Sequence, residues 1–291
     1  MSPDSNKVRN EPIYDKLVDQ LSEIGGYSRA RINGLWNIKL KYQPAQGERL
    51  FEYEVIVCQT NIGQGASYAF EDIDSQRMSR LIGSSISDID FMDYNDYSLK
   101  VAILDSIYAG HFPWAPNLDL SIAGRSSAKA STRAEIVTAE AVRLINRRCL
   151  DKGIKGDVPV ILNIGFVSRF RTVLKEMFPH EFYATDLHPD LVGRTLDGVR
   201  IDDGLGHNEE YLKKADVAII TGMTITTRTL SSLTETAKRY GTDVVIFSET
   251  GYNISAHYVR YGVESVICEE FPYYIFDGSS NIRVFRKKCS S

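Results

Sequence analysis

Gly165 and Asp186 each end a short apolar run, and their separation is typical of a nucleotide-binding site. Gly165 ends "VPVILNIG" and Asp186 ends "EFYATD", a separation of 186 − 165 = 21 residues. In such sites a carboxylate that accepts from ribose hydroxyls stands roughly 20 residues after the first glycine. Alternatively, Asp186 caps the turn "HPDLVG". His188, two residues on, is a candidate catalytic base or a second turn residue.

Two more apolar runs end in polar residues. "VRIDDGLG" places Asp202 and Asp203 before a helical segment, where a carboxylate could accept from an adenine amine or cap a glycine-rich turn. "ADVAIITGMTITTRTL" ends in Thr221, Gly222 and Met223. Gly222 would let the backbone approach a ligand. We predict that these five residues, together with Gly165 and Asp186, belong to the cofactor site and that Thr224, Thr226 or Thr227 caps the following helix.

A fifth run ends in "FSETGYN", which supplies candidates for the chemical step. Glu249 is the first candidate for a buried acid or base, and Tyr252 for an aromatic contact to a positively charged group. Tyr68 and Tyr108 are alternatives for that contact. Because the chain has 16 tyrosines, any one of them could instead serve in packing. The predicted catalytic set is therefore Glu249, Tyr252 and His188.

The elements that would position these residues alternate along residues 123–291. Five short apolar strands with helical segments between most of them predict a doubly wound, mostly parallel sheet. The segment "YYIFDGSSNIRVFRKK" predicts a closing antiparallel hairpin. In such sheets ligands bind outside the carboxyl ends of the strands, where all the polar residues above are placed.

Residues 1–122 have a different pattern. Residues 13–24 predict an amphipathic helix, and "WNIKLKYQ" and "FEYEVIVCQT" predict a hairpin joined through "PAQGER". "GQGASYAFE" predicts a third strand and "YSLKVAILDSIYAGHF" a helix packed on the sheet. We therefore expect a small α+β domain followed by an α/β domain. "WAPNLDLSIAGRSSAKAS" is a candidate linker or lid between them.

Composition argues against several classes of protein. A net charge of −4 provides no basic field for nucleic acid, and no apolar run is long enough to span a bilayer. "MSPDSNKVRNEP" lacks the apolar core of a signal peptide, so we expect a cytoplasmic protein. The four cysteines and five histidines form no metal-binding motif, and no G-x-G-x-x-G fingerprint for NAD is present.

Six segments together resemble a known family: "LIGSSISDI", "SLKVAILDSIYAGHF", "NIGFVSRF", "ATDLHPD", "ADVAIITGMTITTRTL" and "YGVESV". They are similar to a domain-of-unknown-function family called putative heavy-metal chelation, over roughly residues 13–275. The resemblance implies an enolase-N-terminal-like first domain and a Rossmann-like second domain. Asp186 stands where the family would lead us to expect Glu.

The glycine after the first strand and the acids after the next two are also similar to class I S-adenosylmethionine-dependent transferases. That likeness implies an enzyme that binds S-adenosylmethionine and transfers or cyclises a group from it onto a small molecule. The chain departs from those transferases at Phe166 and Val167, where their glycine-rich segment would stand. The alternative hypothesis is a protein that binds a metal ion or metal chelate without catalysis, and a purely structural subunit is a third. Homodimer formation is common in this architecture.

Overall fold

The computed structural model describes residues 10–43 and 50–288, which form two compact units. Unit 1 comprises the chain up to Ala115 together with Met223–Ser231 and Glu249–His257. Unit 2 comprises Pro116–Gly222, Ser232–Ser248 and the chain from Tyr258. A domain boundary at residue 122 stays a prediction. The predicted turn at residues 44–49, the "MSPDSNKVR" part of the N-terminal segment and Cys289 lie outside the described residues.

Unit 1 is built on a three-stranded antiparallel sheet in the order β1-β2-β3. Its strands are β1 (Ile32–Tyr42), β2 (Phe51–Thr60) and β3 (Gln64–Tyr68), and its helices are α1 (Pro12–Asp19), α2 (Ser75–Leu81), α3 (Tyr97–Ile107) and α8 (Tyr252–Ser255). Every residue of α3 is buried, and the helix packs on β2 and β3. The predicted helix–hairpin–strand–helix order is therefore confirmed.

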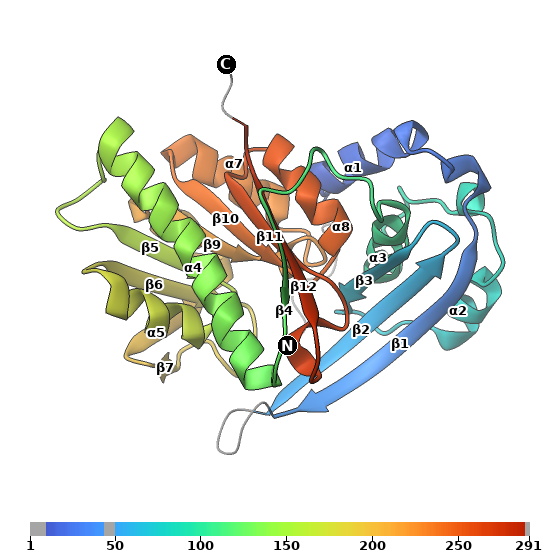
Figure 1. Cartoon of the computed structure of the whole chain (residues 1–291), viewed down its shortest axis with the longest axis horizontal. Helices are drawn as coiled ribbons and strands as arrows, with labels where there is room; N and C mark the ends of the chain where they lie inside the picture. Colours follow the sequence, from blue (N-terminus) through green and yellow to red (C-terminus); the bar gives the residue numbers. More distant parts are fainter. Residues whose placement is uncertain (1–9, 44–49, 289–291) are drawn as a thin grey trace. The chain divides into compact units, whose positions relative to one another are not determined.

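Unit 2 contains a nine-stranded sheet in the order β4-β12-β11-β10-β9-β5-β6-β8-β7 (Figure 1). Its strands are β4 (Leu118–Ile122), β5 (Val160–Ile164), β6 (Glu181–Asp186), β7 (Thr195–Leu196), β8 (Val199–Asp203), β9 (Val217–Thr221), β10 (Asp243–Ser248), β11 (Ser265–Glu269) and β12 (Ser280–Arg286). From β11 to β8 neighbouring strands are parallel, whereas β4, β12 and β7 are antiparallel to their partners. The mixed α/β fold with a mostly parallel sheet is confirmed.

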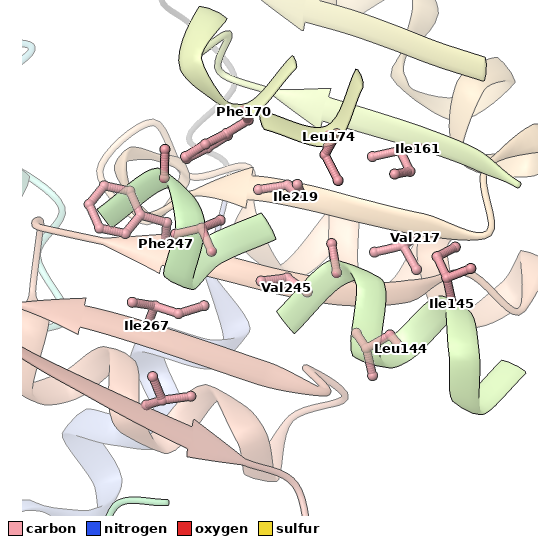
Figure 2. Packing of buried hydrophobic residues seen from close by; sticks show 14 of the residues in the cluster. Leu144, Ile145, Ile161, Phe170, Leu174, Val217, Ile219, Val245, Phe247 and Ile267 are labelled. Atoms are coloured by element: carbon pink, nitrogen blue, oxygen red, sulfur yellow. The ribbon is translucent and has the colours of Figure 1, made fainter. Parts of the chain in front are cut away.

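Helices connect successive strands of that sheet. They are α4 (Ser126–Asp151), α5 (Ser168–Met177), α6 (Gly204–Lys214) and α7 (Leu230–Tyr240), of which residues 230–231 belong to unit 1. The stripe Ala134, Val137, Ala141, Leu144 and Ile145 of α4 packs with Phe170 and Leu174 of α5 on the apolar side chains of the central strands (Figure 2). These central strands are continuous apolar runs because helices or loops bury both of their faces.

Two segments differ from their prediction. The predicted linker or lid at residues 114–131 instead contains β4, which pairs with β12, and the start of α4. Residues 118–122 form a strand because their backbone pairs with β12. The closing antiparallel strand is present, but its partners are β11 and β4, because residues 273–275 form a 3-10 turn rather than a strand.

Candidate functional site

The order of strands in unit 2 reverses between β5 and β9. The chain runs from β5 to β6 and β8 on one side, and from β9 to β10 and β11 on the other. Ile164 pairs with Ile220 in parallel register, so the carboxyl ends of β5 and β9 are neighbours. A reversal of this kind creates the position at which open parallel sheets bind ligands.

Gly165 lies where the two strand ends meet. Its φ is +77°, and a Cβ atom built on it would lie 2.4 Å from the Cγ2 atom of Thr221. Its amide donates to the Thr185 carbonyl at 2.9 Å. Gly165 and Thr221, both predicted at strand ends, therefore lie side by side. The glycine is required by close approach to β9, whether or not a ligand binds.

Asp186 holds the loop that follows Gly165. Its Oδ2 atom accepts from the Phe166 amide at 2.8 Å, and its Oδ1 atom accepts from the His188 amide at 2.8 Å. The second bond is the turn-capping role that the sequence left open. Each carboxylate oxygen has a further lone pair, so turn capping does not exclude a ligand hydrogen bond. Asp186 is half-buried, which places it at the surface of this edge.

Asn163, which the sequence reasoning missed, fixes the same loop from inside. Its Oδ1 atom accepts from the Val167 amide at 2.9 Å, and its Nδ2 atom donates to the carbonyls of Gly165 and Ile219, each at 3.2 Å. It is 1% exposed. The sequence could have pointed to Asn163, because it is the one amide side chain in the otherwise apolar run "VILNIG" and a buried amide needs hydrogen-bond partners.

The acids after β8 have local roles. Asp203 is the N-cap of α6 and accepts from the Leu205 amide at 3.1 Å. Asp202 accepts from the Tyr211 hydroxyl at 2.5 Å and from the Arg200 Nε atom at 2.9 Å. Partial burial raises the pKa of Asp202, but these two hydrogen bonds outweigh it, so its pKa is lowered. Asp202 is therefore an ionised group beside the strand end.

Two exposed leucines adjoin these acids. Leu187 follows Asp186 and is 44% exposed, while Leu205 lies in the first turn of α6 and is 62% exposed. A Cβ atom built on Gly204 would lie 3.3 Å from the Leu187 Cδ2 atom, so Leu187 lies against the start of α6. The edge formed by β5, β6 and β8 thus combines carboxylates with apolar surface.

His188 is an exposed turn residue in this structure. Its Nδ1 atom accepts from the Asp190 amide at 3.2 Å, and its own amide donates to Asp186. These contacts agree with the turn interpretation. A catalytic role for His188 stays a prediction.

The threonine run after β9 is folded onto itself. The Thr226 hydroxyl donates to the Met223 carbonyl at 2.9 Å, and the hydroxyls of Thr227 and Thr229 are 2.9 Å apart. Since α7 begins at Leu230, the prediction that Thr224, Thr226 or Thr227 caps that helix is wrong. Threonine hydroxyls compete for nearby backbone carbonyls, and those of Thr226 and Thr227 lie within hydrogen-bond distance of carbonyls in this loop.

Gly222 lies against β10, and its substitution provides a test of that packing. A Cβ atom would lie 2.0 Å from the Ser248 Oγ atom and 2.7 Å from the Ser248 Cα atom. We expect Gly222→Ala to lower the free energy of unfolding by about 1–3 kcal/mol through overpacking, measured by urea denaturation. Gly156→Ala is the control, because its Cβ would have only an ordinary contact at 3.8 Å. Equal stability of both variants would contradict the assignment.

The predicted acid–base residues of the fifth strand end belong to unit 1. The Tyr68 hydroxyl donates to the Glu249 Oε2 atom at 2.7 Å, an arrangement that can accept and return a proton. The Tyr252 hydroxyl donates to the Gln64 carbonyl at 2.8 Å, and the Tyr108 hydroxyl donates to the Leu17 carbonyl at 2.7 Å. Glu249 therefore pairs with Tyr68, whereas Tyr252 and Tyr108 donate to the backbone. The catalytic roles of Glu249 and Tyr252 stay predictions.

Asp105 anchors the 249–257 segment in unit 1 and was also missed. It is fully buried on α3, and its oxygens accept from the amides of Ala66 at 3.0 Å, Asn253 at 2.7 Å and Ile254 at 3.0 Å. Burial raises the pKa of Asp105 to about 7, although the three amides act in the opposite direction. The signal was an acid inside the apolar helix "SLKVAILDSI".

The part of the chain that the structure describes, residues 10–43 and 50–288, also bears on metal binding and membrane insertion. Within these residues no group of three or more His, Cys, Asp or Glu side chains could hold a metal ion. None of the helices described there is long and apolar enough to cross a membrane.

Comparison with known proteins identifies similar folds. No protein-family model matches the chain, and no curated protein matches it. A DUF364-family protein of unknown function from Desulfitobacterium hafniense DCB-2 is 12% identical, over 94% of this chain and 98% of that one, with a TM-score of 0.56. A second DUF364 protein of unknown function, from Pyrococcus horikoshii, is 14% identical over 95% and 98%, with a TM-score of 0.49. At these identities the first match supports the α/β fold alone.

Proposed function

We propose that unit 2 binds an adenosyl group at the carboxyl ends of β5, β6 and β8, and that the protein is an S-adenosylmethionine-dependent enzyme acting on a small molecule. The observation that carries this proposal is the position of Asp186. Its carboxylate is held beside the Gly165 turn, next to the reversal of strand order, by the amides of Phe166 and His188. A ribose diol needs an acceptor of this kind at this place.

The surroundings of Asp186 suit the rest of an adenosyl group. The exposed side chains of Leu187 and Leu205 offer apolar surface to a purine ring, which would remove that surface from water. Asp202 and Asp203 lie at the end of the adjacent strand, with Asp186 paired to Asp203 in the sheet register. Carboxylates there can accept from an exocyclic amine.

The residues present fit a nucleoside better than a pyrophosphate. Phe166 and Val167 occupy the turn after Gly165, and their amides already donate to the side chains of Asp186 and Asn163. Those amides are the groups that would otherwise cradle phosphate oxygens. When bound, S-adenosylmethionine supplies an electrophilic carbon next to its sulfonium. The protein's task is to bind the donor and orient it, which needs little acid–base chemistry.

We expect Asp186→Ala to weaken the binding of S-adenosylmethionine or S-adenosylhomocysteine by at least about tenfold, which corresponds to about 1.4 kcal/mol. A ligand at 100 times its dissociation constant stabilises a protein by about 2.7 kcal/mol, so a thermal-shift titration detects it. Affinities of wild type and variant are then compared by calorimetry. The panel includes NAD and divalent metals, which represent the competing hypotheses.

Asp190→Ala is the matched control, because it removes the same charge from the same exposed turn. It should bind the adenosyl compound as the wild type does. Binding of only NAD or only metals would refute the proposal, as would an Asp186→Ala variant with unchanged affinity.

A further inference from the structure

The loop Met223–Thr229, which carries the threonine run, presents an arginine in an unusual conformation. Arg228 has a φ of +54°, in the left-handed region that non-glycine residues rarely adopt. Two backbone hydrogen bonds of the loop fix this conformation. The Arg228 amide donates to the Ile225 carbonyl at 3.1 Å, and the Thr229 amide donates to the Thr224 carbonyl at 3.0 Å. Strain of this kind persists where the surrounding structure imposes it, and it often marks a functional position.

Two tyrosines of unit 1 hold the Arg228 side chain. Its guanidinium carbon lies 5.4 Å from the ring centre of Tyr94 and 5.2 Å from that of Tyr97. The two rings are themselves stacked, with centres 5.4 Å apart and planes at 29°. Tyr97 is 1% exposed, so the base of this support is part of the core. A guanidinium stacked on rings is fixed in direction while its N–H groups at the edge stay available.

The edge of the guanidinium has no acceptor in the described part of the chain. Arg228 is half-buried, and its side chain forms neither a hydrogen bond nor an ion pair with residues 10–43 or 50–288. Two acids of unit 1 have other partners: Asp15 accepts from the Tyr94 hydroxyl, and Glu11 accepts from the Ser231 amide. A half-buried guanidinium has lost part of its hydration, and a charge-assisted partner would replace it.

We propose that Arg228, held in place by its loop and by the two tyrosine rings, is the binding site for the oxyanion of a small molecule, a carboxylate or a phosphate group. The planar fork of arginine matches two oxygens of either group. The hydroxyls of Thr227 and Thr229, 2.9 Å apart, flank it in sequence, and their bonds to each other and to the loop carbonyls fix the loop that presents Arg228. The site lies within unit 1, whereas the proposed adenosyl site lies within unit 2, so either proposal can fail without affecting the other.

The test is a thermal titration with sodium phosphate and, separately, sodium succinate, at constant ionic strength maintained with sodium chloride. Tryptophan fluorescence is the readout, because both tryptophans, Trp36 and Trp114, belong to unit 1. We expect a saturable rise in melting temperature at millimolar concentration. Arg228→Gln should raise the half-saturating concentration about tenfold or more. The stronger of the two probes identifies the oxyanion class.

Two further variants separate binding from folding. Arg228→Gly should also lose the response but melt no lower than Arg228→Gln, because glycine adopts a positive φ without strain. Arg80→Gln removes an exposed arginine of unit 1 and should respond as the wild type does. The proposal is overturned if neither probe gives a saturable shift, if Arg228→Gln responds like the wild type, or if Arg80→Gln loses the response equally.

Discussion

Replacing Asp216 with alanine should lower the free energy of unfolding of unit 2 by about 3–5 kcal/mol. Asp216 is fully buried just before β9. It accepts from the Arg148 Nε atom at 3.1 Å and from the amides of Lys155 at 2.9 Å and Val160 at 3.0 Å. The variant leaves those two amides without this acceptor and Arg148, 7% exposed, without its closest carboxylate. Arg148 keeps the Gly241 carbonyl at 2.7 Å and the Asp243 carboxylate at 3.7 Å, but removing one partner of a buried ion pair is strongly destabilising.

Urea denaturation followed by far-ultraviolet circular dichroism measures this loss. Tryptophan fluorescence, which reports on unit 1, shows in the same samples whether that unit is affected. Asp157→Ala is the control, since it removes an exposed carboxylate from the same connection between α4 and β5. If Asp216→Ala loses less than about 1 kcal/mol, the buried ion pair contributes no more to stability than a typical exposed ion pair, and the prediction is wrong.

Raising the pH from about 5.5 to about 8.5 should destabilise unit 1 by about 2 kcal/mol through Asp105, and by a similar amount through Glu11. Burial raises the pKa of both carboxyls to about 7, from ordinary values of 3.8 for Asp and 4.5 for Glu. Because the folded-state pKa is the higher one, the folded state holds these protons more tightly. The contribution to stability is complete below the unfolded pKa and is lost as the pH rises through about 7.

The measurement is urea unfolding of unit 1, followed by tryptophan fluorescence, across this pH range. Asp105→Asn and Glu11→Gln should each flatten the pH dependence by their share, because neither amide titrates. The readout is the slope, so a change in overall stability of a variant does not disturb it. Asp88→Asn, at an exposed site, should keep the wild-type slope. A wild-type stability that rises toward alkaline pH would contradict the assignment.

The candidate site residues predicted from sequence are those whose position follows from the order of strands along the chain. Gly165 follows β5, Asp186 and Thr221 are the last residues of β6 and β9, and parallel strands bring their carboxyl ends to one edge of a sheet. Their grouping therefore followed once the strands were recognised. What each side chain contacts did not follow, since Asp186 could cap its own turn, contact a ligand, or do both.

The residues that were missed are buried polar groups. Asn163 and Asp105 lie inside apolar segments, where their partners come from loops and elements distant in the chain: Asp105 accepts from residues 39, 148 and 149 positions away. Segments 223–231 and 249–257 likewise belong to unit 1 because of contacts with parts of the chain that are distant in sequence. The hydrophobic periodicity of a single segment carries no information about contacts with distant segments.

The sequence by itself determined the class of fold, because alternating apolar strands and helices can bury their faces only in a layered α/β arrangement. It also determined that polar residues gather at the carboxyl edge of the parallel sheet. The tertiary structure decided that β4 completes the sheet, that the threonine hydroxyls bond their own loop, and that Arg228 rests on two tyrosines. The pairing of β4 with β12 and the contact of Arg228 with the tyrosine rings join segments distant in the chain, and the threonine hydroxyls could have bonded a helix end instead of their loop, so only the folded chain selects these partners.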